Sequence, residues 1–204
     1  MGSLQSLENI THVLSNKAAE YDVFVETGCG WGGSLDFASQ FPFKKLFSVE
    51  VVEEAYLKCK ERFVGREDRI IIDNDESGGF LNRILPGLAD SRIIFWLDAH
   101  WPGLDCRIAH RDSNNERIAL PLRRELQAIF TWRKKLKDII LIDDLRIYED
   151  GKFQSGNLRP TQVPILPRDR TTKFIENLFK ETHEITRFSQ DDGYVTLVPR
   201  EILE

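Results

Sequence analysis

Residues 23–34 read VFVETGCGWGGS, and this stretch decides the fold of the chain. An apolar, β-prone run ends on Glu26, four glycines follow within six positions, and residues 34–40 then have the pattern of a helix. Glycine reaches positive φ at little cost and lets a ligand approach the backbone closely. N–H groups at a helix start favour electron-rich ligand atoms. The stretch predicts a strand, turn and helix that hold a nucleotide-like ligand, although a tight connection without a ligand has the same glycines.

A second acidic strand end follows 22 residues after Gly28. Residues 45–50, KLFSVE, have the pattern of a strand that ends on Glu50. A carboxylate at this distance from a glycine turn can accept hydrogen bonds from both hydroxyls of a ribose, and its charge would repel a 2′-phosphate. The two segments together predict a site for an adenosine with an unmodified ribose.

The rest of the chain alternates between helical and strand patterns. The expected helices cover 1–21 (from about residue 3), 51–63, 80–85, 120–136 and 174–179, and the further expected strands cover 69–73, 92–98, 138–144, 183–188 and 194–198. The runs 92–98 and 138–144 are almost continuously apolar, which is typical of parallel strands buried on both faces. Asp192-Gly193 between the last two runs predicts a hairpin. The fold class is therefore α/β: a doubly wound, mostly parallel sheet of seven strands that ends in an antiparallel hairpin.

This pattern resembles the class I S-adenosylmethionine-dependent methyltransferases, with residues 26–30 as their first motif and Glu50 as their ribose-binding acid. Nicotinamide dehydrogenases share the glycine turn, but they continue in parallel units and are longer, so the hairpin favours the methyltransferases. The resemblance implies one Rossmann-like methyltransferase domain over residues 1–204, with S-adenosylmethionine as its cofactor. The cofactor-binding residues that it implies are Glu26, Thr27, Gly28, Cys29, Gly30, Gly33, Ser34, Glu50, Asp75, Ser77 and Asp98. Asp75 is assigned to the exocyclic amine of adenine, and a polar turn that caps the next helix explains it equally well.

Carboxylates end two strands that the topology makes neighbours. Asp98 follows one apolar run, and Asp143 and Asp144 close the next. Because adjacent strands lie about 4.8 Å apart, these side chains can converge, and a hard cation such as Mg²⁺ would offset their repulsion. The pattern is similar to the metal-dependent O-methyltransferases of macrolide sugars, the macrocin O-methyltransferase-like group, and to their cephalosporin hydroxylase-like relatives. That resemblance implies Asp98, Asp143 and Asp144 as metal ligands, and a helix cap or turn is the alternative for the Asp pair.

One position departs from the pattern of these relatives. The second acid of their Asp-Gly-Asp or Asp-Ala-Asp is replaced here by an imidazole, in Asp98-Ala99-His100. We assign the catalytic role to His100 and Asp98. His100 can take the proton of an acceptor hydroxyl or add a nitrogen ligand to a metal, and a histidine that merely hydrogen-bonds an aspartate fits as well.

Composition narrows the choice of acceptor. A net charge of −5 over 204 residues argues against a general nucleic-acid surface, which needs a basic footprint. We expect a small-molecule or glycan acceptor, no DNA, no membrane association and a cytoplasmic location, and we leave a specific RNA and a homo-oligomer open. The three cysteines lack the spacing of a zinc site or a disulfide framework, so we interpret them as reduced thiols. Two polar segments, 101–119 and 149–169, are the expected substrate loops.

The predicted function is a metal-assisted O-methyltransferase that acts on a hydroxyl of a sugar, a glycan or a small natural product. Three alternatives stay open at this point. A relative of the same fold could use the metal for hydroxylation, and a non-catalytic subunit could bind the cofactor for a partner. A nicotinamide oxidoreductase is disfavoured by the chain length and the hairpin. Fold alone does not fix function, so the decision depends on the site.

Overall fold

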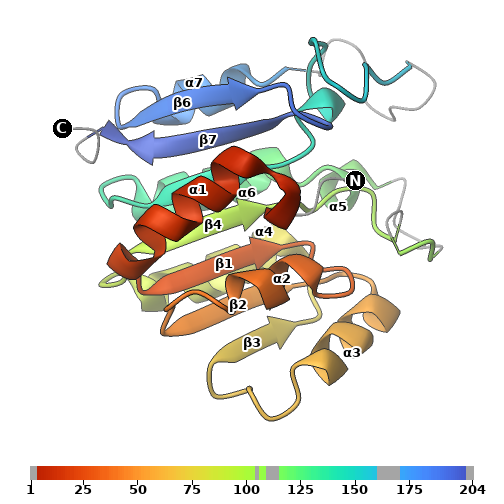
Figure 1. The fold of residues 1–204 in the computed structure, drawn as a ribbon, viewed down its shortest axis with the longest axis vertical. Coiled ribbons are helices and arrows are strands. Elements are labelled where there is room, and N and C mark those ends of the chain that lie inside the picture. Colours follow the sequence, from red (N-terminus) through yellow and green to blue (C-terminus); the bar gives the residue numbers. More distant parts are fainter. Residues whose placement is uncertain (1–3, 104–105, 109–114, 160–170, 201–204) are drawn as a thin grey trace.

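Seven strands form one sheet in the part of the chain that the computed structural model describes, residues 4–103, 106–108, 115–159 and 171–200. Their order is β3-β2-β1-β4-β5-β7-β6 (Figure 1). The strands are β1 (Val23–Thr27), β2 (Lys45–Val49), β3 (Ile70–Asp73), β4 (Ile93–Leu97), β5 (Ile139–Ile142), β6 (His183–Phe188) and β7 (Tyr194–Pro199). The first five are parallel and the last two run antiparallel to their neighbours, which confirms the predicted fold class.

The central strands are buried along their whole length. Every residue of β1, β4 and β5 is buried, as expected for apolar runs covered on both faces. In the pairing of β4 with β5, Leu97 lies opposite Ile142. Asp98 and Asp143 follow these two positions, so both lie at the carboxyl ends of their strands, next to each other.

Helices cover both faces of this sheet (Figure 1). One face packs against α1 (Glu8–Lys17), α2 (Gly33–Ala38) and α3 (Glu53–Arg62), and the other packs against α4 (Ser77–Ile84), α6 (Leu122–Arg133) and α7 (Lys173–Phe179). The shorter elements are η1 (Leu4–Ser6), η2 (Ala18–Glu20), η3 (Leu85–Leu88), η4 (Leu145–Ile147) and α5 (Glu116–Ala119). No helix in the described ranges has the length and apolar character that crossing a membrane requires.

Two expectations about helices need correction. The helix expected over 1–21 is, from Leu4 on, a ten-residue α1 with a 3₁₀ turn on each side, and residues 1–3 lie outside the described part. Leu7, Ile10 and Leu14 are buried as the spacing indicates, and Val13 is partly buried. The polar segment 101–119 contains α5, a single turn that its composition did not indicate. Residues 104–105 and 109–114 of that segment, and 160–169 of the segment 149–169, lie outside the described part of the chain.

The predicted hairpin is present. β6 pairs with β7 from His183 opposite Pro199 to Phe188 opposite Tyr194. In the connection, Asp191 and Gly193 both have positive φ, 52° and 77°. A β-carbon on Gly193 would stand 2.3 Å from the ring of Phe153, so a glycine is required at this position for space as well as for its backbone angle.

A buried ion pair joins elements at the amino ends of the strands. Arg133 in α6 donates from Nε to Asp138 at 2.5 Å, and its terminal nitrogens donate to the carbonyls of Leu88 and Ser91 at 2.7 and 2.6 Å. Asp138 also accepts from the backbone N–H of Ile93 at 2.8 Å. The side chains of Arg133 and Asp138 are 0% and 3% exposed. Because each buried charge has several partners, this network ties α6 and η3 to the sheet.

Candidate functional site

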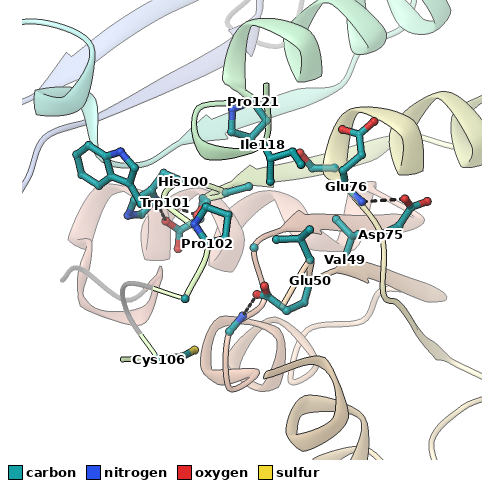
Figure 2. Close-up of a pocket in the computed structure, with 17 residues that line it drawn as sticks. Val49, Glu50, Asp75, Glu76, His100, Trp101, Pro102, Cys106, Ile118 and Pro121 are labelled. Atoms are coloured by element: carbon teal, nitrogen blue, oxygen red, sulfur yellow. Dashed lines mark hydrogen bonds and ion pairs between the residues drawn. The ribbon is translucent and has the colours of Figure 1, made fainter. Parts of the chain in front are cut away.

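A cleft opens at the carboxyl ends of the parallel strands, where open α/β sheets bind ligands (Figure 2). Its volume is about 590 Å³, including space that is open to solvent. Six of the predicted cofactor residues line it: Gly28, Gly30, Glu50, Asp75, Ser77 and Asp98. Five do not: Glu26, Thr27, Cys29, Gly33 and Ser34. The cleft also has walls that the sequence did not single out, among them Val49, Glu76 and Pro121, and the expected substrate loop 101–119 contributes Pro102, Cys106 and Ile118.

Gly28 fixes the glycine turn against the end of β4. Its φ is +78°, and a β-carbon there would stand 2.8 Å from the carbonyl oxygen of Asp98 and 2.9 Å from Cα of Ala99. Both atoms belong to the backbone, so no side-chain movement could make room. Residue 28 is therefore a glycine both because of its backbone angle and because β4 approaches so closely.

Glu50 is held rigidly beside the same turn. Its Oε2 accepts from the backbone N–H of Gly30 at 2.8 Å, and its Oε1 accepts from the N–H of Val52 at 2.9 Å. The residue is 8% exposed and lines the cleft (Figure 2). Each carboxylate oxygen has a second lone pair, so Glu50 can still accept from ligand hydroxyls in this position.

In the acidic turn after β3, Asp75 and Glu76 have different partners. Asp75 accepts from the N–H of Glu76 at 2.8 Å and pairs with Arg83 at 2.5 Å. Glu76, which the sequence did not single out, caps α4 by accepting from the N–H of Gly78 at 3.0 Å and forms a bidentate pair with Arg124 at 2.9 and 3.1 Å. The capping alternative weighed for Asp75 thus applies to its neighbour, and a contact of Asp75 with adenine stays a prediction.

The five predicted residues outside the cleft support it from behind or lie beside it. Glu26 is fully buried and accepts from the Ser48 hydroxyl at 2.6 Å, and burial raises its pKa to about 8. A hydrogen bond with the Cys59 thiol, together with burial, raises the pKa of the Cys29 thiol. Gly33 and Ser34 begin α2, and Thr27 ends β1 with its side chain buried. A thiol that is buried and hard to ionise packs the turn and is no nucleophile.

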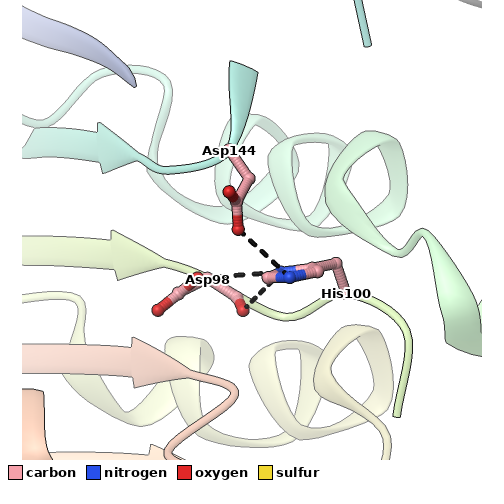
Figure 3. A group of neighbouring side chains, drawn as sticks. All are labelled: Asp98, His100 and Asp144. Carbon is pink, nitrogen blue, oxygen red and sulfur yellow. Dashed lines mark hydrogen bonds and ion pairs between the residues drawn. The ribbon is translucent and has the colours of Figure 1, made fainter. Parts of the chain in front are cut away.

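Asp98, His100 and Asp144 come together at the end of β4 and β5 (Figure 3). His100 Nε2 lies 3.1 Å from Asp144 Oδ2, and Nδ1 lies 3.1 Å from the carbonyl oxygen of Asp98 and 3.7 Å from its Oδ1. One ligand atom from each residue lies within 4.8 Å of the others. All three side chains are less than one-fifth exposed. This group can bind a proton or a cation.

Asp143 does not join this group, although the sequence assigned it as a metal ligand. It is 6% exposed, and its Oδ1 accepts from the N–H of Asp144 at 2.9 Å. Burial raises the pKa of Asp143, and the charge of Asp144 raises it further. The backbone of Asp144 has a φ of 54°, a left-handed conformation that is uncommon for a residue with a side chain and often marks functional sites. Among the described residues, Asp98, His100 and Asp144 are the three whose ligand atoms lie close enough to share one cation, and Asp143 as a ligand stays a prediction.

A second, small cavity lies beside the group and reaches Glu125 of α6. It has a volume of about 10 Å³ and is lined by Asp98, His100, Asp143, Asp144, Glu125 and Tyr148, among others. Glu125 is 1% exposed, and neither of its carboxylate oxygens has a hydrogen-bond partner within bonding geometry. Burial raises its pKa to about 7, and the nearby hydroxyls of Ser77 and Thr27 act in the opposite direction. Burial, and then the charge of Glu125, raises the pKa of Tyr148.

Sequence reasoning missed Glu125, although a signal was present. In α6 the apolar residues Leu122, Leu126 and Ile129 form the buried face, and Glu125 lies on that face. A carboxylate among core positions is costly without a partner, so its position on the helix points to a functional or structural need.

Known proteins resemble this chain in structure. No model of a known protein family and no curated protein sequence matches it. A Staphylococcus aureus structure described as a "putative caffeoyl-CoA O-methyltransferase" aligns over 98% of this chain and 85% of its own, with 15% identity and a TM-score of 0.59. An O-methyltransferase from Bacillus cereus, solved with SAH, aligns over 93% and 79%, with 12% identity and a TM-score of 0.53. An rRNA methylase from Streptococcus thermophilus aligns over 93% of this chain and 96% of its own, with 14% identity and a TM-score of 0.55. The chain therefore has the fold of the class I S-adenosylmethionine-dependent methyltransferases.

Proposed function

We propose that the chain is an S-adenosylmethionine-dependent O-methyltransferase that acts, with the help of a divalent metal ion, on a hydroxyl of a sugar, a glycan or a small natural product. The proposal depends above all on one observation. A single cleft joins the Gly28–Gly30 turn and Glu50, which suit a nucleoside, to Asp98 and His100, which suit proton and cation chemistry. An O-methyltransferase with the same fold was solved with SAH, which supports the choice of cofactor.

Each part of the cleft has a role in this proposal. The glycine turn and Glu50 hold S-adenosylmethionine, which supplies the methyl group. Trp101 and Pro102 line the cleft beside His100 and exclude water from it. A divalent cation held by Asp98, His100 and Asp144 would lower the pKa of the acceptor hydroxyl. Without a metal ion, the facing atoms His100 Nε2 and Asp144 Oδ2 could instead take up the proton of the acceptor hydroxyl.

The charge of the chain and its loops support the acceptor class. A net charge of −5 disfavours a polyanionic acceptor, which needs a basic footprint. Residues 101–103, 106 and 118 contribute to the wall of the cleft, so the segment 101–119 borders the place where an acceptor would enter. An rRNA methylase also has this fold, and for that reason an RNA acceptor belongs in the test.

Calorimetric titration tests the cofactor assignment. We expect the full chain to bind S-adenosylhomocysteine more tightly than NADH. We expect Glu50→Ala to lose affinity by about 10- to 100-fold, because a charged acceptor of hydrogen bonds is removed. The matched control is Glu54→Ala, an exposed carboxylate at the start of α3 that pairs with Lys58 and lies outside the cleft.

Two results would contradict the proposal. A preference for NADH would point to oxidoreductase chemistry. Equal losses in Glu50→Ala and Glu54→Ala would mean that the ligand does not depend on the carboxylate in the cleft. If the cofactor binds as expected, methyl transfer from labelled S-adenosylmethionine to panels of glycosides, phenols and RNA identifies the acceptor class.

A further inference from the structure

The ring of His100 is oriented as metal-binding histidines are. Its Nδ1 lies 3.1 Å from the carbonyl oxygen of Asp98, so an N–H at this nitrogen donates to that oxygen. The lone pair then belongs to Nε2. Histidines that bind metals usually donate their other N–H to a carbonyl or carboxylate, which fixes the tautomer and aims the ligand nitrogen.

The atom that faces Nε2 is also an acceptor. Asp144 Oδ2 lies 3.1 Å from it, and in the Nδ1–H tautomer neither atom carries a hydrogen. A cation bound by both atoms would hold them at this distance, as a proton on Nε2 would. The remaining member of the group, Asp98, adds a further carboxylate, and two carboxylates with an imidazole form a ligand set that divalent ions bind.

An independent observation comes from α6. Glu125 is 1% exposed, its two carboxylate oxygens lack hydrogen-bond partners, and it lines the same small cavity as Asp98, His100 and Asp144. A volume of about 10 Å³ is close to the space that one water molecule needs. Oxygen atoms that are buried without partners beside three ligand-type atoms indicate that the cavity is built for an occupant that they can bind, directly or through water.

The distances fit one ion. Two ligand atoms that bind the same ion at about 2.1 Å lie at most about 4.2 Å apart. One ligand atom from each of the three residues lies within 4.8 Å of the others, so these atoms need to approach by no more than about 0.6 Å. Small side-chain rotations are enough for that.

We propose that Asp98, His100 and Asp144 form a site selective for a first-row transition-metal ion such as Mn²⁺ or Co²⁺, with His100 Nε2 as a ligand and Asp143 outside the site. Mg²⁺ prefers oxygen ligands and keeps much of its water, whereas imidazole favours the transition metals. The inference deepens the proposed function by naming its metal, and it rests on that function for its catalytic meaning.

Metal binding to the full-length chain, first stripped with a chelator, tests the inference without any assay of activity. We expect Mn²⁺, followed by its electron paramagnetic resonance signal, to bind at least about tenfold more tightly than Mg²⁺ in competition. We expect electron spin echo modulation of the bound Mn²⁺ to show coupling to a histidine nitrogen. Either a preference for Mg²⁺ or a Mn²⁺ spectrum without nitrogen coupling would overturn the inference.

Two variants identify the ligands. His100→Asp makes an all-oxygen site, so we expect the nitrogen coupling to vanish and the preference for Mn²⁺ over Mg²⁺ to fall by about tenfold. Asp143→Asn is the matched control, and it should keep both the coupling and the preference. If Asp143→Asn loses the metal while His100→Asp retains the preference, the ligand set is Asp98, Asp143 and Asp144, and the inference is wrong.

Titration with S-adenosylhomocysteine separates this inference from the proposed function. A chain that binds Mn²⁺ through His100 but does not bind S-adenosylhomocysteine would retain the metal site and lose the methyltransferase assignment. A chain that binds S-adenosylhomocysteine but no transition metal would retain the methyltransferase assignment and lose the metal site. Binding of S-adenosylhomocysteine by His100→Asp shows that this variant is folded. If the variant does not fold, the nitrogen coupling measured in the unmodified chain still decides whether a histidine binds the metal.

Discussion

The two ends of the sheet bury charge in opposite ways. At the amino end, Arg133 donates to Asp138 and to two carbonyls, and Asp138 also accepts from a backbone N–H. At the carboxyl end, the oxygens of Glu125 lack partners, and His100 Nε2 faces a carboxylate oxygen of Asp144. The same sheet thus carries a buried ion pair with several hydrogen bonds at one end and, at the other, a buried carboxylate, Glu125, whose oxygens lack hydrogen-bond partners.

This difference in hydrogen bonding suggests that buried charges at the amino end serve stability and that those at the carboxyl end serve function. A buried charge whose hydrogen bonds are complete contributes to the order of the fold and has nothing left for a ligand. A buried carboxylate without partners costs free energy, and such a cost persists where a ligand or a proton compensates it. Substitutions at the two ends should therefore act on different observables.

The largest effect on stability should come from the amino end. Arg133→Ala leaves Asp138 as a buried charge without its main partner, and we expect the free energy of unfolding to fall by about 3–5 kcal/mol. Urea denaturation measures it. Lys58→Ala, which breaks an exposed pair with Glu54 at 2.9 Å, is the control and should cost less than about 1 kcal/mol. Similar losses in the two variants would mean that burial does not decide the value of these pairs.

The next effect depends on pH and concerns Glu125. Its pKa in the folded chain, about 7, is above the ordinary value of 4.5, so folding favours the protonated form. The resulting stabilisation is complete below pH 4.5 and is lost as the pH rises through 7. Gln cannot ionise, so the stability of Glu125→Gln relative to the unmodified chain should rise by about 3 kcal/mol from pH 4 to pH 8.

Denaturation at a series of pH values measures this difference. Asp36→Asn is a suitable control, because Asp36 is a partly exposed carboxylate in ion pairs with Arg62 and Arg66 and lies on the other face of the sheet. It should not show the rise with pH. A difference between Glu125→Gln and the unmodified chain that stays constant from pH 4 to pH 8 would contradict a raised pKa for Glu125.

The smallest effect on stability, and a large one on activity, is expected for Asp144→Asn. The change removes the repulsion with Asp143 and also the charge that faces His100, so we expect the free energy of unfolding to fall by much less than in Arg133→Ala. Methyl transfer should fall by about 100-fold or more, because a group that binds the cation or proton loses its charge. A variant that is strongly destabilised but fully active would reverse the comparison between the two ends.

The fold could be predicted from the sequence because its signals are local. The apolar runs 92–98 and 138–144 became β4 and β5, and Asp192-Gly193 marked the connection between β6 and β7. The meeting of Asp98 with the Asp143-Asp144 pair also followed, since parallel neighbours end at one edge of the sheet. Periodicity and strand order together were sufficient for this much.

The detail of the site could not be predicted, because it depends on backbone angles and on partners far away in the chain. Which of two adjacent aspartates faces His100 is decided by the left-handed backbone of Asp144, and an Asp-Asp pair does not reveal that angle. The role of Glu76 depends on Arg124, which is 48 residues away. The approach of Glu125 depends on how α6 packs against the sheet, which a pattern on a single helix does not specify.

The contact between Gly28 and the backbone of Asp98 has a consequence for redesign. A β-carbon at residue 28 would touch the carbonyl oxygen of Asp98, so the turn that would carry the methyl donor and the strand end that would meet the acceptor share one fixed point. The segments 101–119 and 149–169 follow the two strand ends in the chain and do not include this point. If these segments set the acceptor, as proposed, we expect grafting them between relatives to change acceptor preference and to leave the contact between residue 28 and the end of β4 in place.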